Sequence, residues 1–332
     1  MRNAILEYFH QFLSGEAWNQ FWYEARDARV ISLMRIGVGA IALFALLCYT
    51  PDLIKFFGPS GLLPANTVRA VMFAEEATPD KPSFLYGSFL MSFNYLAWFE
   101  NEPAMLWGAH GVGIAILLAF VVGLKTRVTS VLALIVTLTY IHRGQVLNAQ
   151  LEPIVSMVMA YLCLGPCGAY YSVDRCLQLR KQPLAKVEPS IGANIATRLL
   201  QIHLSAIYVM MAFGKLVRLG VADGAVWWSG DAVWWLIAKP GGSLVDLTWL
   251  HSHPYMIDAW TQAIVFFELG FGIFVWKRWA RPALLVLAVP MWLSLAVLTG
   301  LIPWCLMMLV ANLAFVRPDD CCGAGHAPRP AL

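Results

Sequence analysis

The residues of this chain that could do chemistry are charged side chains within long apolar runs. Lys215 follows the apolar run from Ala206 to Phe213, and Glu268 lies in the middle of a later run. Charges inside apolar segments of this length are costly, so each indicates a functional site. Both also have a structural interpretation, because a lysine near a helix end can reach the lipid headgroups and a buried carboxylate can be protonated or paired.

A second group of polar residues lies at the ends of neighbouring apolar runs. We expect these residues to meet Lys215 in an outward-facing pocket, covered by the tryptophan-rich segment 225–238 and with Glu268 as a further candidate. Each could instead be an ordinary residue of the membrane interface. The group consists of His110, His142, Arg143, Asn148 and Glu152, with Trp228 and Asp231 from the covering segment.

The elements that must position these side chains are membrane helices. Of the 332 residues, 59% are hydrophobic and 13% are charged, about half the charged fraction of a soluble domain. Basic residues are scattered among the loops, which argues against nucleic-acid binding. We therefore predict an all-α, polytopic integral membrane bundle whose partners are the lipid membrane and a lipophilic small molecule, with any protein substrate unknown.

Apolar runs of about twenty residues predict the crossings. About eight transmembrane helices are expected, near 29–50, 104–124, 127–142, 151–170, 196–217, 259–276, 281–299 and 301–316. Two aromatic segments, 84–99 and 225–238, are predicted to be interfacial or re-entrant. We expect residues 1–28 to form a cytoplasmic, amphipathic interfacial segment without a signal peptide, residues 29–317 the membrane domain, and residues 318–332 a flexible cytoplasmic tail.

The distribution of lysine and arginine predicts the orientation. With the N-terminus inside, fifteen of the 23 basic residues lie on the inner side and six on the outer side, while Arg35 and Lys215 lie within helices. The positive-inside rule then places both termini in the cytoplasm. Lys215, His110, His142, Arg143 and Glu152 all fall toward the outer side.

Other motifs indicate no metal site. The pair His251 and His253 has no evident third ligand, and Cys163 and Cys167, four residues apart in an apolar helix, are typical of packing residues. The chain has no GxGxxG, P-loop or HExxH pattern.

An ordered set of short motifs resembles the HTTM (horizontally transferred transmembrane) domain family, which includes the membrane part of vitamin K-dependent gamma-glutamyl carboxylase. The resemblance covers roughly residues 25 to 317. The motifs are Arg35-Ile-Gly37, Phe57-Gly-Pro-Ser-Gly-Leu-Leu-Pro64, Tyr171-Ser-Val-Asp174, Gln201-Ile-His203, Gly214-Lys-Leu216, Trp228-Ser-Gly-Asp231 and a late glutamate-bearing helix.

The resemblance implies a carboxylase-like, quinone-oxidising enzyme (a lyase). Its co-substrates would be a reduced, vitamin K-like quinone, carbon dioxide and oxygen, and Lys215 would be the base that deprotonates the hydroquinone. A family histidine aligns near Leu151 and Glu152, so its role is either absent or taken by Glu152 or His142. A second family histidine aligns with Trp292, and the chain is expected to lack the lumenal domain that engages protein substrates.

Three functions follow from these patterns. The first is a multi-pass enzyme of a bacterial-type inner membrane that binds a quinone-like molecule, with Lys215, Glu152 and His142 as catalytic residues. The second is a non-catalytic lipid- or quinone-binding protein that retains the same scaffold. The third is a small-solute transporter, which the broken segment 225–238 suggests but for which no inverted repeat is visible.

Overall fold

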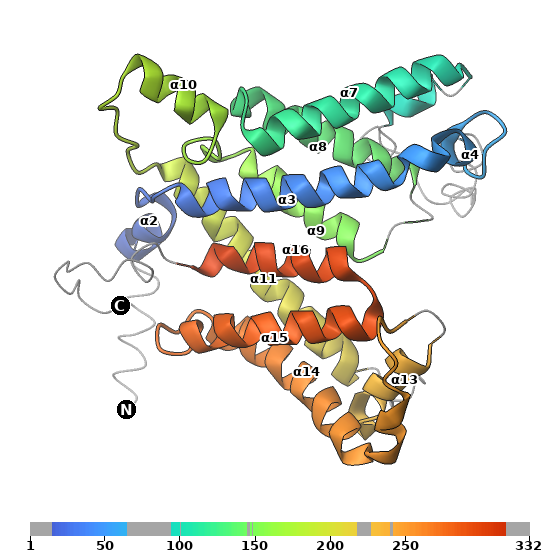
Figure 1. The fold of residues 1–332 in the computed structure, drawn as a ribbon. Coiled ribbons are helices and arrows are strands. Elements are labelled where there is room, and N and C mark those ends of the chain that lie inside the picture. Colours follow the sequence, from blue (N-terminus) through green and yellow to red (C-terminus); the bar gives the residue numbers. More distant parts are fainter. Residues whose placement is uncertain are drawn as a thin grey trace, which may run out of the picture. The chain divides into compact units, whose positions relative to one another are not determined.

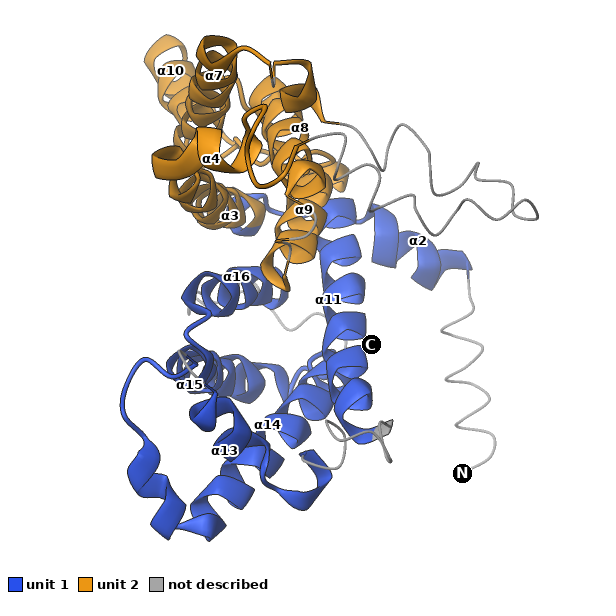
Figure 2. Ribbon diagram, turned by 90° about the vertical axis from the view of Figure 1, so that its right-hand side faces the viewer, with its two compact units in different colours: residues 1–30, 194–332 blue, residues 31–193 orange. Residues whose placement is uncertain are grey.

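The computed structural model describes residues 15–64, 94–99, 101–144, 147, 149–217, 227–239 and 242–316. Within these ranges 76% of the residues are helical and none forms a strand, which confirms the predicted all-α class for the described part of the chain. The chain divides into two compact units (Figure 2). Unit 1 contains residues 1–30 and 194–332, and unit 2 contains residues 31–193.

Five helices among the described residues are long and apolar enough to cross a membrane. They are α3 (Arg29–Cys48, continued to Phe57), α7 (Pro103–Val122), α11 (Ile191–Val217), α14 (Pro254–Phe274) and α15 (Arg281–Thr299). Three further predicted segments also contain helices, namely α8 (Thr126–Arg143), α9 (Leu151–Leu162) and α16 (Ile302–Asn312). A bundle of eight crossings remains a prediction.

Unit 2 is built on the hairpin of α7 and α8, which lie side by side (Figure 1). Helix α9 packs on α8, while α4 (Leu53–Phe57) packs on α7 and the 3₁₀ turn η3 (Tyr95–Trp98) on α8. Helix α10 (Val173–Lys181) is polar, and the hydroxyl of Ser172 accepts a hydrogen bond from the Arg175 N–H at its start, as an N-cap residue does.

The turn between α7 and α8 is fixed by residues from elsewhere in unit 2. Asp174 accepts hydrogen bonds from the backbone N–H groups of Lys125 and Thr126, both at 2.7 Å, and from the Thr126 hydroxyl at 3.0 Å. Gly123 has a φ of 77°, and a Cβ atom there would lie only 1.9 Å from Nη1 of Arg35. Arg35 donates to the Tyr171 carbonyl at 2.6 Å, so its buried charge has a structural role in this turn.

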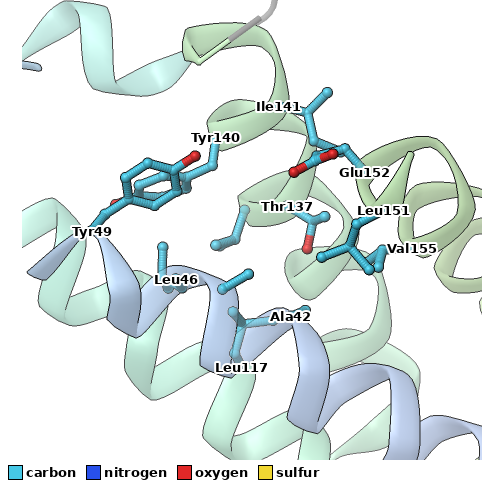
Figure 3. Close-up of a pocket in the computed structure, with 12 residues that line it drawn as sticks. Ala42, Leu46, Tyr49, Leu117, Thr137, Tyr140, Ile141, Leu151, Glu152 and Val155 are labelled. Carbon is cyan, nitrogen blue, oxygen red and sulfur yellow. The ribbon is translucent and has the colours of Figure 1, made fainter. Parts of the chain in front are cut away.

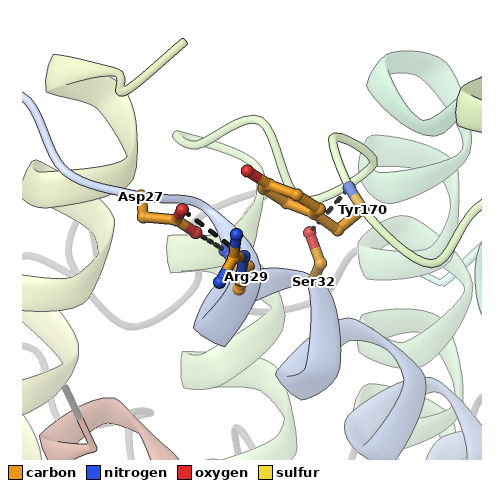
Figure 4. Close-up of polar contacts among 4 residues, drawn as sticks. All are labelled: Asp27, Arg29, Ser32 and Tyr170. Carbon is orange, nitrogen blue, oxygen red and sulfur yellow. Dashed lines mark hydrogen bonds and ion pairs between the residues drawn. The ribbon is translucent and has the colours of Figure 1, made fainter. Parts of the chain in front are cut away.

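The N-terminal part of α3 carries two local polar contacts (Figure 4). Asp27 accepts a hydrogen bond from the N–H of Arg29 at 2.7 Å, a helix-terminal donor that the helix itself leaves unpaired. Ser32, which is fully buried, accepts from the N–H of Tyr170 at 3.2 Å within unit 2.

Unit 1 combines α11 and α13 (Ala232–Ala238) with α14, α15, α16 and the 3₁₀ turns η5 (Thr248–Ser252) and η6 (Leu313–Phe315). Helix α2 (Gly15–Tyr23) also belongs here, because the Asn194 side chain donates to the carbonyls of Phe21 and Trp22. The Arg198 guanidinium lies 4.2 Å from the Phe21 ring centroid. An N-terminal helix was predicted; its place at a membrane interface remains a prediction.

Helices α11 and α14 approach closely at Gly272. A Cβ atom at this position would lie 2.6 Å from Cγ2 of Val209 and 3.1 Å from the Ser205 carbonyl oxygen. Next to Val209 on α11, the buried Tyr208 hydroxyl accepts a hydrogen bond from Trp292 Nε1 at 2.7 Å and is hydrogen-bonded to the Asn312 amide at 3.0 Å. The crossing fixes which residues of the two helices face each other.

Several predicted boundaries differ from the structure. Helix α9 ends at Leu162 rather than at residue 170, and the chain then turns through Gly165, Pro166 and Gly168. Segment 225–238 is broken as expected, since Gly230 has a φ of 92° before α13 begins. Most of segment 84–99 and all of the predicted tail 318–332 lie outside the described residues.

Candidate functional site

The predicted site residues divide between the two units. Lys215, Glu268, Trp228 and Asp231 belong to unit 1, and His110, His142, Arg143 and Glu152 belong to unit 2. Asn148 lies outside the described residues. Each set is therefore described within its own unit.

In unit 1, Lys215 and Glu268 form an ion pair. Nζ of Lys215 donates to Oε1 of Glu268, and the carboxylate is fully buried while the lysine side chain is 18% exposed. Lys215 lies seven residues, about two helical turns, after Tyr208, so both face α14. Glu268 lies one turn before Gly272, and the close approach of the helices there brings it within reach of the lysine.

Aromatic rings surround this pair. The Lys215 ammonium lies 4.6 Å from the Trp227 ring centroid, a cation–π contact. Seven residues before Lys215 on α11, Tyr208 stacks on Phe271 with the ring centroids 4.2 Å apart. The second carboxylate oxygen of Glu268, Oε2, is buried and has no hydrogen-bond partner among the described residues. A buried oxygen of this kind can accept a proton or a ligand's hydrogen bond.

The chemistry available to this arrangement is proton transfer. Burial penalises both charges of an ion pair, which brings the charged pair and the neutral amine–acid pair closer in free energy. The two forms differ by the position of one proton, which moves along the hydrogen bond between Lys215 Nζ and Glu268 Oε1. In the neutral form Lys215 carries a free electron pair and can act as a base.

In unit 2, His110 joins two hydroxyl groups. Its Nδ1 lies 2.6 Å from the Tyr140 hydroxyl and its Nε2 lies 3.0 Å from the Thr50 hydroxyl. His110 is 1% exposed. Tyr140 stacks on Tyr49 with the ring centroids 5.8 Å apart. The hydrogen bond to His110 and the stacking contact hold the rings of Tyr140 and Tyr49 in place near the C-terminal end of α8.

A pocket of about 60 Å³ opens beside these rings (Figure 3). Its walls are mostly apolar, and Glu152 is the one acidic or basic side chain among the described residues that line it. Glu152 Oε2 accepts a hydrogen bond from the Ala149 N–H at 2.8 Å. The lining residues are Ala42, Ala45, Leu46, Tyr49, Leu117, Val136, Thr137, Tyr140, Ile141, Leu151, Glu152 and Val155.

The other predicted residues of unit 2 lie outside this pocket lining. Arg143 is fully buried, donates to the Phe57 carbonyl at 3.2 Å and lies 5.5 Å from the Phe57 ring centroid, contacts that hold α8 to α4. His142 is half-buried near the end of α8. His110 is not part of the described lining, but it is hydrogen-bonded to Tyr140, which is.

The predicted tryptophan cover contributes one ring to Lys215. Trp227 makes that contact, whereas Trp228 is 63% exposed and offers its carbonyl oxygen to the Gln262 amide at 3.4 Å. Asp231 is exposed and accepts a hydrogen bond from the Ser229 hydroxyl at 2.8 Å. Neither Trp228 nor Asp231 has a contact with the ion pair in the described structure.

Sequence reasoning missed the residues that complete both sites. Trp227 lies in the tryptophan-rich segment 225–238, from which Trp228 was named instead, and Tyr49, Thr50 and Tyr140 were not singled out. A usable signal existed for the tyrosines, since both lie near the end of an apolar run: Tyr49 directly precedes Thr50, and Tyr140 lies two residues before His142. No cluster of three metal-ligating side chains occurs among the described residues.

Comparison with known proteins returned no match to a family model, to a curated protein or to a solved structure. Function is therefore inferred from the side chains described above and from the sequence motifs.

Proposed function

We propose that this chain is an integral membrane protein of the HTTM type that binds a quinone-like or other lipophilic molecule and uses Lys215 as a base. The observation that carries the proposal is the pairing of Lys215 with the fully buried carboxylate of Glu268 next to Trp227. The bias of lysine and arginine supports an orientation with both termini in the cytoplasm, and the resemblance to the HTTM family supports a bacterial-type cell membrane.

The proposed cycle moves one proton at a time. Glu268 first accepts the proton of the Lys215 ammonium, which leaves a neutral acid and a neutral amine. The amine then removes the proton from a hydroquinone hydroxyl, and the resulting ammonium lies beside the hydroquinone anion that it stabilises. Trp227 offers a flat aromatic surface against which a quinone ring can stack.

The variant Lys215→Arg tests this role. Arginine keeps the positive charge, the ion pair with Glu268 and the contact with Trp227, but it stays protonated at neutral pH and cannot act as a base. Purified protein in detergent is given reduced menadione, a naphthohydroquinone, and its oxidation by dissolved dioxygen to menadione and hydrogen peroxide is followed. We expect the protein-dependent rate to fall by about 10²-fold or more, the usual contribution of a general base.

Two controls make the result specific. Lys239→Arg changes an exposed lysine of the same unit and should leave the rate unchanged. Quenching of tryptophan fluorescence by menadiol measures binding, which Lys215→Arg should retain. A Lys215→Arg protein that oxidises menadiol at the wild-type rate would disprove the assignment of the base.

A second candidate function is binding without catalysis. It is favoured by the ion pair itself, because in its charged form the pair leaves Lys215 no free electron pair. In that case menadiol quenches the tryptophan fluorescence of the wild-type protein, yet its oxidation rate equals the rate in detergent alone.

A further inference from the structure

We infer that the pocket of unit 2 binds a small organic cation, an ammonium group with a short apolar body, with Glu152 as its counter-charge. This site is separate from the ion pair of unit 1 and goes beyond the function proposed for Lys215. Its evidence is the shape of the pocket, its charge and the aromatic rings that line it.

The space exists because α3 has small residues where it faces α8 and α9. Ala42 and Ala45 lie three residues apart on the pocket side of α3, with Leu46 and Tyr49 following on the same face. Larger side chains at these two positions would fill the space. Since a water molecule needs on the order of 10–15 Å³ by this measure, a pocket of about 60 Å³ suits a head group of a few heavy atoms and not a fused-ring quinone.

The charge of the pocket selects the sign of the ligand. None of the described residues that line it is basic, so the Glu152 carboxylate is not neutralised by the wall. One of its oxygens, Oε2, is taken by the Ala149 N–H at the start of α9, and the carboxyl group turns toward the pocket (Figure 3). A carboxylate charge in an apolar pocket repels an anionic ligand and attracts a cation.

The aromatic wall adds to this preference. Tyr49 and Tyr140 border the same pocket, and aromatic ring faces attract ammonium groups through cation–π contacts. The hydrogen bond between Tyr140 and His110 holds the Tyr140 ring in this wall. Leu46, Leu117 and Val155 then provide contacts for methyl groups.

The test uses a matched pair of probes, choline and 3,3-dimethylbutan-1-ol. The two molecules have the same shape, but the second has a tert-butyl group in place of the trimethylammonium group. Binding is measured by calorimetry on the full chain in a maltoside detergent, which contains no ammonium group. We expect wild-type protein to bind choline at least tenfold more tightly than the neutral alcohol.

Substitutions locate the binding. Glu152→Gln keeps the size of the side chain and the acceptor for the Ala149 N–H but removes the charge. This variant should bind choline and the neutral alcohol with about equal affinity. Glu102→Gln, an exposed carboxylate at the start of α7, should leave the preference unchanged. Ala45→Leu should abolish binding of both probes, whereas Ala40→Leu on the exposed face of the same helix should not.

A final comparison distinguishes a free ammonium ligand from a lipid headgroup. Dihexanoylphosphatidylcholine and dihexanoylphosphatidylglycerol are tested in the same way, and a preference for the choline lipid at Glu152 identifies the headgroup as the source. Equal affinity for charged and neutral probes in the wild-type protein, or choline binding that survives Glu152→Gln or Ala45→Leu, would overturn the inference. Lys215→Arg should not change choline binding, which separates this site from the proposed base.

Discussion

Unit 1 buries an ion pair between two helices, whereas unit 2 buries a chain of hydroxyl and imidazole groups. In unit 1 the stabilising interaction depends on both partners, because either charge alone is costly in an apolar setting. In unit 2 each lost hydrogen bond leaves an uncharged group, which is less costly. The comparison teaches that the two sites should respond very differently to the removal of a single side chain.

The largest expected effect is that of Lys215→Met, which leaves the fully buried Glu268 carboxylate without its partner. We expect a loss of about 3–5 kcal/mol in the free energy of unfolding. Glu268→Met should cost less, because Lys215 is partly exposed and its long side chain can reach a polar layer. The double variant should recover most of the loss. Unfolding in mixed micelles with SDS measures all three, and purely additive losses would show that the pair is not coupled.

Tyrosine hydroxyls allow a matched comparison of the two units. Tyr208→Phe removes a group that bonds to both Trp292 and Asn312, whereas Tyr140→Phe removes a group that bonds to His110. We expect losses in unfolding free energy of about 1–3 kcal/mol, with the larger loss for Tyr208→Phe because it leaves two buried partners unsatisfied. The exposed Tyr255→Phe serves as a control without effect. A larger loss in unit 2 would reverse the comparison.

Helix packing should also differ between the units. Gly272→Ala places a methyl group 2.6 Å from Val209, and overpacking there costs about 1–3 kcal/mol, partly offset by about 0.5–1 kcal/mol of helix propensity. At Gly113 in α7 the nearest atom would be 3.3 Å away, so Gly113→Ala should be close to neutral. The same unfolding assay compares both, and equal losses would show that α11 and α14 are no more tightly packed than α7 and its neighbours.

The smallest effect is expected at Asp246, an exposed carboxylate of unit 1. Hydrogen bonds from the Thr248 hydroxyl and then from its backbone N–H lower the pKa of Asp246 below its usual value. The group therefore stabilises the fold above the ordinary aspartate pKa of about 4, and this contribution disappears as the pH falls through the lowered pKa. The small difference in unfolding midpoint between wild type and Asp246→Asn should shrink below that pH. A difference that grows on acidification would have the wrong sign.

The sequence predicted helix positions better than side-chain partners. The apolar run 281–299 coincides with α15, and Arg29 begins α3 as expected, because charges and prolines bound these runs. The predicted helix 151–170 is longer than the observed α9, because hydropathy does not distinguish an apolar helix from the apolar turns at Gly165 and Pro166.

The candidate site could be predicted only in part. Lys215 and Glu268 were each identified as unusual charges, but they lie 53 residues apart and their pairing depends on how α11 crosses α14 at Gly272. A glycine in an apolar helix does not reveal which residue it lies against. The contact of His110 with Tyr140 was missed because it too depends on how two helices pack, here α7 and α8 of the hairpin.

The short connection between α7 and α8 has no tolerance for inserted residues. An added residue would move the N–H groups of Lys125 and Thr126 away from Asp174, and any side chain at position 123 would meet Arg35. The irregular stretch 186–189 after α10 is mostly exposed and makes no such set of contacts in the described structure. An affinity tag or a fluorescent protein inserted into 186–189 would leave both buried sites intact, which makes this stretch the natural position for a reporter.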